Sequence, residues 1–94
     1  MNAKAINLGI FFMTLSLAPG AHADGAAADA CAANLQPDGK AIYAATVAGQ
    51  PTADTLKSIV ESQTRSLAMA GKIGRGEARE NAVAAAECVR LRFQ

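Results

Sequence analysis

The 94-residue chain has few aromatic side chains and almost no histidine: it contains no tryptophan, one tyrosine, three phenylalanines and one histidine. The one histidine, His22, lies in a segment that we expect to be removed on export. Without His22 the exported chain lacks histidine, which is the commonest general base. It therefore cannot form a Ser–His or Cys–His nucleophile pair. It also lacks imidazole as a zinc ligand. The sequence therefore argues against an enzyme and against a metal centre.

Large apolar side chains are scarce in the exported part as well. Leu, Ile, Val and Phe account for 12 of the 71 residues from Asp24 onward, whereas alanine accounts for 18. A domain of this kind gains only about 3 to 5 kcal/mol from one hydrophobic core, so it usually depends on a covalent crosslink, a metal or a partner. The same scarcity favours a homodimer, which would bury what one copy cannot.

The N-terminal segment has the features of a secretory leader. Lys4 supplies a positive charge, residues 8–18 form an apolar run, and Ala21-His22-Ala23 has the small-residue pattern of a cleavage site. The apolar run is shorter than the roughly 20 residues that a membrane-spanning helix needs. We therefore predict a signal peptide over residues 1–23, cleavage after Ala23, and a periplasmic or secreted product that does not stay in the membrane.

Cys31 and Cys88 are the only two cysteines of the chain. An even number of cysteines after a leader predicts a disulfide. Closing the loop between them would stabilise the fold by about 4 kcal/mol through loss of chain entropy in the unfolded state. The C-x-x-C spacing of redox sites is absent, and no acidic cluster at ligand spacing joins the thiols. We therefore favour a structural crosslink over a redox site, a metal site or a crosslink between subunits.

The pattern of the exported part predicts one helical domain over residues 31–94, with a flexible tail over residues 24–30 before it. Alanine-rich residues 26–35 predict a short first helix, and Pro37-Asp38-Gly39 predicts a turn after it. Residues 40–48 mix strand-favouring residues with alanine. Because no second strand-like segment could pair with them, we favour a helix there over a strand.

Two longer helices are predicted after Pro51. Thr52 is a good N-cap for a helix over residues 53–70, which carries an apolar stripe and a favourable Glu61/Arg65 pair. A helix over residues 77–92 begins with acids and ends with bases, which matches the helix dipole. Its small side chains share one face: Ala78, Ala82, Ala85, Ala86 and Val89. The expected fold is all-α, with three to four helices, a C-terminal antiparallel helical hairpin and one disulfide.

The connector over residues 71–76 combines glycines, two bases and a following helix N-terminus, which are the ingredients of an anion-binding nest. It is not a Walker loop, which requires G-x-x-x-x-G-K-[ST]. We favour the alternative, in which the glycines cap the two helices and Ile73 packs into the end of the hairpin. The candidates for a small anionic ligand are Lys72, Arg75 and Arg79.

The charge of the exported part is balanced, which argues against nucleic acid as a partner. Acids dominate residues 24–56 and bases dominate residues 57–94, a distribution that favours two halves packed together over a dedicated binding face. Glu77, Glu80 and Glu87 could in principle exchange protons, but the domain is too small to enclose a substrate cleft. A partner helix could dock where a large side chain is left exposed; the candidates are Tyr43, Met69 and Phe93.

The sequence thus predicts a non-enzymatic exported protein that acts through protein contacts, as a binding or stress-related accessory factor. A binding module for a small anion is the alternative, and an enzyme ranks third. In outline the expected arrangement is similar to small disulfide-closed helical proteins of the bacterial periplasm, including acid-stress chaperones. This resemblance is architectural, since no motif matches those proteins residue by residue.

Overall fold

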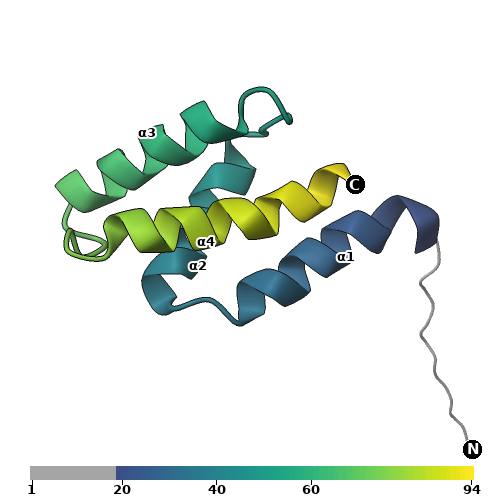
Figure 1. The fold of residues 1–94 in the computed structure, drawn as a ribbon, viewed down its shortest axis with the longest axis horizontal. Helices are drawn as coiled ribbons and strands as arrows, with labels where there is room; N and C mark the ends of the chain where they lie inside the picture. The colour runs from purple at the N-terminus through teal and green to yellow at the C-terminus, as the bar shows by residue number, and fades with distance from the viewer. Residues whose placement is uncertain (1–18) are drawn as a thin grey trace, which may run out of the picture.

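The computed structural model describes the backbone of residues 19–94 and the side chains of residues 25–94. The features of the predicted leader before Pro19 therefore lie outside the described residues. The described chain is helical and contains no strand, which confirms the all-α class and the helical prediction for residues 40–48 (Figure 1). Its elements are α1 (Pro19–Ala33), α2 (Pro37–Ala48), α3 (Leu56–Met69), α4 (Ala78–Arg90) and the 3₁₀-helix η2 (Leu91–Phe93).

Helical structure begins earlier than the sequence analysis predicted. Residues 24–30, for which we expected a flexible tail, belong to α1, and Ala28 in this segment is fully buried. Alanine explains this, because it is the best helix former and is small enough to let helices approach closely. In this case α1 packs against α2, α4 and η2. The first helix therefore starts well before Cys31, the residue near which the sequence analysis placed the start of the folded domain.

The predicted turn at Pro37-Asp38-Gly39 is wrong, because these residues form the first turn of α2. Proline is well tolerated at the start of a helix, where its missing N–H costs no hydrogen bond, and Asp38 places a negative charge at the positive end of the helix dipole. The chain turns just before them, where Asn34 and Leu35 donate their N–H groups to the carbonyls of α1.

Helix α3 begins at Leu56, three residues later than predicted. In the turn before it, the Thr52 N–H donates to Thr55 Oγ1 at 2.8 Å, and the Thr55 N–H donates to Thr52 Oγ1 at 3.2 Å. This reciprocal pattern is that of a capping box. The Leu56 N–H also donates to the Thr52 carbonyl. The N-cap residue of α3 is therefore Thr55 and not Thr52 as predicted, and Thr52 accepts the Thr55 N–H in the turn that precedes the helix.

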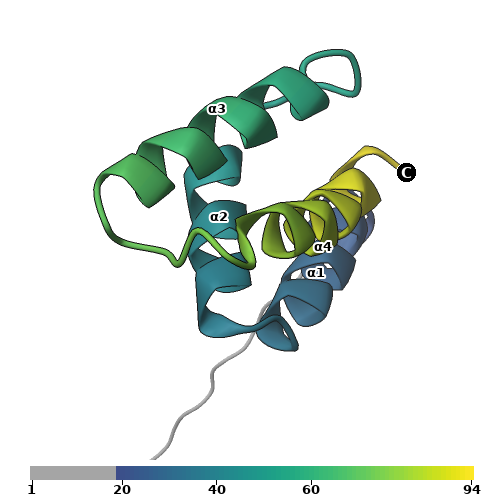
Figure 2. The same ribbon diagram turned by 60° about the vertical axis from the view of Figure 1, so that its left-hand side comes forward.

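The hairpin of α3 and α4 is present, and the two helices run in opposite directions in both views (Figures 1 and 2). Helix α3 ends in a Schellman motif, in which the Gly71 N–H donates to the Ala68 carbonyl and the Lys72 N–H donates to the Leu67 carbonyl. Gly71 has a φ of 75°, the left-handed conformation that this motif requires. Ile73 is buried at the end of the hairpin, as predicted.

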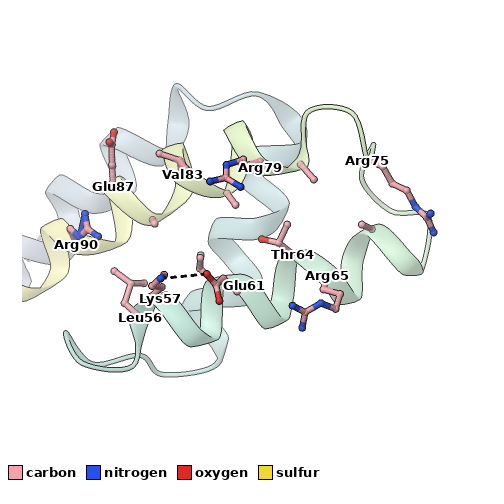
Figure 3. A pocket seen from close by; sticks show the side chains of 15 residues that line it. Leu56, Lys57, Glu61, Thr64, Arg65, Arg75, Arg79, Val83, Glu87 and Arg90 are labelled. Carbon is pink, nitrogen blue, oxygen red and sulfur yellow. Dashed lines mark ion pairs between the residues drawn. The ribbon is translucent and has the colours of Figure 1, made fainter.

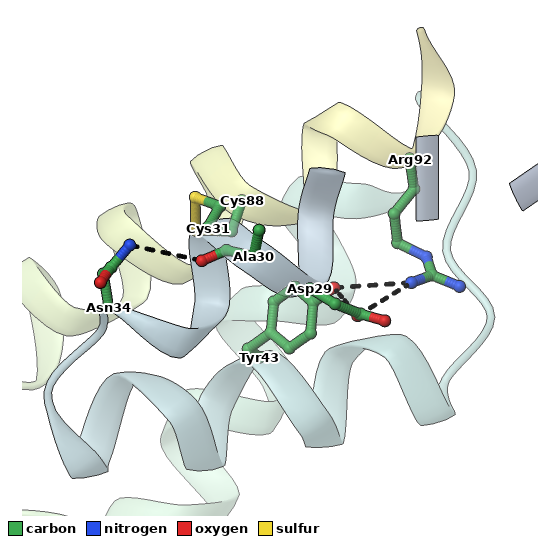
Figure 4. Close-up of a disulfide and its surroundings, with 7 residues drawn as sticks. All are labelled: Asp29, Ala30, Cys31, Asn34, Tyr43, Cys88 and Arg92. Carbon is green, nitrogen blue, oxygen red and sulfur yellow. Dashed lines mark hydrogen bonds and ion pairs between the residues drawn. A yellow bond between two sulfur atoms is a disulfide. The ribbon is translucent and has the colours of Figure 1, made fainter. Parts of the chain in front are cut away.

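The core lies where α2, α3 and α4 meet, and α1 covers the C-terminal part of α4 together with η2. The Cys31–Cys88 disulfide is formed and joins α1 to α4, with its Cα atoms 5.4 Å apart (Figure 4). The core is thin and contains few large side chains. Its buried apolar residues are Ala28, Ala32, Ile42, Tyr43, Leu56, Val60, Ile73, Ala85, Cys88 and Val89. Among the described residues, no helix has the length and apolar character needed to cross a bilayer.

Candidate functional site

A groove of about 680 Å³ lies between α3 and α4, on the side of the hairpin that none of the other helices lines (Figure 3). On α4 its lining residues recur every four positions, which places them in two adjacent rows along one helix face. The inner row is Ala78, Ala82 and Ala86, and the outer row is Arg79, Val83 and Glu87. The groove therefore follows most of the length of the hairpin.

The floor of this groove is apolar. Leu56 and Val60 of α3 are buried in it, and the alanines of the inner row are only half-buried. Val83 is 54% exposed, although valine is an apolar residue and stands in the middle of α4. The hairpin thus leaves apolar side chains facing solvent instead of closing over them.

The rim of the groove is mainly basic. It carries five bases and two carboxylates: Lys57, Glu61 and Arg65 on α3, Arg75 in the connector, and Arg79, Glu87 and Arg90 on α4. The local charge is therefore more positive than the formal net charge of +1 for the whole chain. Such a surface attracts anionic groups, and the attraction is strongest at low salt.

One ion pair lies on this rim. Lys57 Nζ is 3.9 Å from Glu61 Oε2, one helical turn away, and both side chains are exposed. Glu61 therefore pairs with Lys57 in place of Arg65, the partner that we had expected, since both lie four residues from it on the same helix. An exposed pair of this kind contributes little stability. Within residues 25–94, the four arginines of the rim make no ion pair, so their charge is available to a ligand.

The three bases proposed for a small anion are not brought together. Arg75 and Arg79 line the groove, whereas Lys72 lies outside its lining. In the connector, the N–H of Gly74 donates to Asp38 Oδ2 at 2.9 Å. The carboxylate of Asp38 therefore accepts a hydrogen bond from one of the backbone N–H groups that an anion-binding nest would offer to a ligand. The contact also joins residues 24–56 to residues 57–94.

Of the three large side chains that we considered as exposed docking points, Met69 and Phe93 are exposed and Tyr43 is not. Tyr43 is 8% exposed and donates its hydroxyl hydrogen to Asp29 Oδ1 at 2.9 Å (Figure 4). Arg92 lies 3.5 Å from the same hydroxyl and 3.7 Å from the Asp29 carboxylate. Burial raises the pKa of Tyr43, while the hydrogen bond from Arg92 acts in the opposite direction. This cluster holds α1, α2 and η2 together.

The acidic residues considered for proton exchange do not form one site. Glu87 stands on the rim of the groove, whereas Glu77 and Glu80 lie outside its lining and are exposed. Within the described part of the chain, no three His, Cys, Asp or Glu residues are grouped as a metal site requires. The groove itself offers guanidinium groups, which bind anions but do not exchange protons at neutral pH.

The sequence analysis did not predict the groove, although it assigned the residues that line it to the correct helices. The alanine row of α4 was assigned to the inner face of a hairpin, as small side chains at helical spacing usually are. The available signal was Val83, an apolar residue one position after Ala82 and in register with Arg79 and Glu87. No protein-family model matches the chain, and the searches of curated proteins and of solved structures found no match.

Proposed function

We propose that this chain is exported and acts as a non-enzymatic binding protein, with the α3–α4 groove as its binding surface. The observation that carries the proposal is the exposure of Val83 beside a row of half-buried alanines, inside a groove with a basic rim. Exposure of apolar side chains to water is unfavourable, so a partner that fills this groove and covers them gains binding free energy.

The nature of the rim supports binding over catalysis. Four of its five bases are arginines, whose guanidinium groups stay charged and offer fixed donors for carboxylate or phosphate. The walls of the groove are held in place from behind, since α3 and α4 both pack against α2 and the disulfide fastens α4 to α1. A preorganised surface loses little conformational entropy when a partner binds.

Export is supported by two independent features of the chain. The first is the leader pattern of residues 1–23, and the second is the formed Cys31–Cys88 bond. Disulfides persist in the periplasm and in secreted proteins, and are rare where thiols are kept reduced. Mass spectrometry of the exported product is expected to find Asp24 as its first residue. An intact Met1 on a membrane-bound product would contradict the proposed leader.

Position-specific photocrosslinking tests the binding surface. A benzophenone amino acid replaces Val83 in the full chain, and in a matched variant it replaces Ser58, which is exposed on α3 but lies outside the groove. After irradiation of intact cells we expect a discrete adduct from position 83 that position 58 does not form. The same adducts from both positions, or none from position 83, would remove the groove as the binding surface.

A further inference from the structure

We infer that the occupant of the groove is an amphipathic α-helix of a partner protein that carries acidic side chains along both edges of its apolar face. This inference rests on the proposed function and adds the chemistry of the partner. It follows from the shape of the groove, from the small side chains of its floor and from the placement of its charges.

The shape of the groove suits a helix. Its walls are two antiparallel helices, and on α3 its lining extends from Leu56 to Ala68, a distance of about 18 Å at 1.5 Å per residue. A ligand helix of about three turns has that length. Helix-in-groove recognition uses a straight apolar trough of this kind, with anchors on the ligand at intervals of three and four residues.

The floor of the groove lets a ligand backbone come close. Ala78, Ala82 and Ala86 lie one turn apart along α4, and each presents only a methyl group to the groove. Packed helices approach to roughly 8 to 10 Å, and the shortest approach needs small side chains at the contact. A third helix laid over the hairpin would also cover Val83, the exposed apolar residue of the outer row.

The charges are distributed along the groove and on both of its sides. Lys57 and Arg65 stand on α3, Arg79 and Arg90 stand on α4, and Arg75 stands beyond the start of α4 (Figure 3). A ligand with one anionic headgroup would meet only one or two of these bases. A helix with several carboxylates along each edge can meet bases on both sides at once. Glu61, which pairs with Lys57, and Glu87 interrupt the row of bases, so the complementary ligand carries its carboxylates opposite the four arginines that make no ion pair within the described residues.

An acyl chain fits these observations less well. The groove is open to solvent, as the 54% exposure of Val83 shows, so a bound acyl chain would keep much of its surface in water. Burial of apolar surface is the main favourable contribution to lipid binding. An amphipathic helix has a polar face that can remain in solvent, so an open groove does not weaken its binding in this way.

The test uses the exported full-chain product and a fluorescein-labelled, side-chain-crosslinked helical peptide of about 15 residues, with a leucine face flanked by glutamates. Two matched peptides serve as controls: one has lysine in place of each glutamate, and the other has the glutamate sequence scrambled. By fluorescence anisotropy we expect the glutamate peptide to bind at least about tenfold more tightly than either control, and its Kd to rise with salt.

Charge-reversed variants locate the bound peptide. Arg65→Glu and Arg79→Glu, on opposite sides of the groove, are each expected to weaken binding by about fivefold or more, because each replaces an attraction by a repulsion. Lys72→Glu is the matched control, with the same change of charge on an exposed residue outside the groove, and should change the Kd by less than about twofold. Equal effects of the three variants would overturn the inference. Circular dichroism melts confirm that each variant is folded.

The outcomes separate this inference from the proposed function. If the glutamate peptide does not bind but position 83 still gives its specific adduct in cells, the groove remains a binding surface and the acidic helix is wrong. If neither is seen, both proposals fail. Tighter binding of the lysine peptide, or binding of phosphatidylglycerol vesicles in place of the glutamate peptide, would also overturn the acidic helix.

Discussion

The backbone N–H of Gly74 donates a hydrogen bond of 2.9 Å to Asp38 Oδ2, and this contact joins the α3–α4 connector to the first turn of α2. The two residues are 36 positions apart. The carboxylate therefore serves two purposes, because it also lies at the positive end of the α2 dipole. An element that resembled an anion site in the sequence is in this fold a contact between the two halves of the chain.

Replacing Asp38 tests the strength of this contact. Asp38→Ala removes both the acceptor for the Gly74 N–H and the charge at the start of α2, and should lower the free energy of unfolding by about 1 to 2 kcal/mol. Glu80→Ala is the matched control, since Glu80 is an exposed acid in the first turn of α4. Urea denaturation of both variants measures the difference. Equal losses would show that the charge matters and the hydrogen bond does not.

Removal of the disulfide should be the most damaging change in this chain. Reduction, or the double change Cys31→Ala with Cys88→Ala, is expected to lower the free energy of unfolding by about 4 kcal/mol, because the unfolded chain regains the entropy of a long loop. The thin core leaves little to offset this loss. Circular dichroism melts with and without reductant measure it. An unchanged melting temperature would contradict the structural role of the bond.

Tyr43 should make the stability fall at high pH. Burial raises the pKa of its hydroxyl above the ordinary value of 10.0, so the folded state keeps the proton at a pH where the unfolded state releases it. The stabilisation is therefore complete below pH 10 and is lost as the pH rises through the higher pKa of the folded protein. Urea denaturation between pH 8 and pH 11 should show this decline.

Tyr43→Phe is the control for that decline. It removes the hydrogen bond to Asp29 and is expected to cost about 1 kcal/mol at neutral pH. It also removes the titrating group, so the remaining pH dependence above pH 10 should be shallower than in the unmodified protein. A decline of the same steepness in both proteins would assign it to other groups, such as lysines.

Thr46 offers a stabilising substitution. Its side chain is fully buried on α2, and its Oγ1 has no hydrogen-bond partner among the described residues. Thr46→Val replaces that hydroxyl by a methyl group of similar size and should raise the free energy of unfolding by about 1 kcal/mol. Thr46→Ala, which leaves a cavity as well, should lower it. A loss of stability in the valine variant would show that the hydroxyl is satisfied, for example by a buried water.

Gly71 and Gly76 form a matched pair for testing the Schellman motif. A Cβ added at either position would meet no atom within 4 Å, but only Gly71 has the left-handed φ. Gly71→Ala should therefore lower the free energy of unfolding by about 1 kcal/mol, because a side chain disfavours that conformation. Gly76→Ala should have a smaller effect. Denaturation curves that coincide for the two variants would contradict this explanation.

The sequence was sufficient for those features that depend on composition and local pattern. The disulfide followed from two cysteines after a leader, and the hairpin followed from the apolar stripe of α3 and the dipole-matched charges of α4. The start of α2 could not be predicted in this way, because Pro-Asp-Gly suits a turn as well as a first helical turn. The third residue, Gly39, is buried near Asn81 of α4, and this tertiary contact is absent from local propensity.

The groove shows a second limit of sequence analysis. Periodicity indicates which face of α4 is apolar, but it does not indicate how many neighbours cover that face. In the fold, α4 turns Ala85 and Val89 into the core and leaves Ala82 and Val83 against a gap that α3 only partly closes. The early start of α1 has a similar cause, because burial of Ala28 requires elements that are distant in the sequence.

The packing of α1 against η2 has a consequence for the order in which this protein can be assembled. A polypeptide emerges from its N-terminus, so Cys31 becomes available 57 residues before Cys88 does. Throughout that interval α1 has neither its covalent partner nor the residues of η2 that it packs against. A chain that stalls before Cys88 would carry an unpaired thiol on an undocked helix, which is a ready substrate for oxidative mispairing. The surface that receives α1 is therefore complete only after the segment that contains Cys88 and η2 has been made.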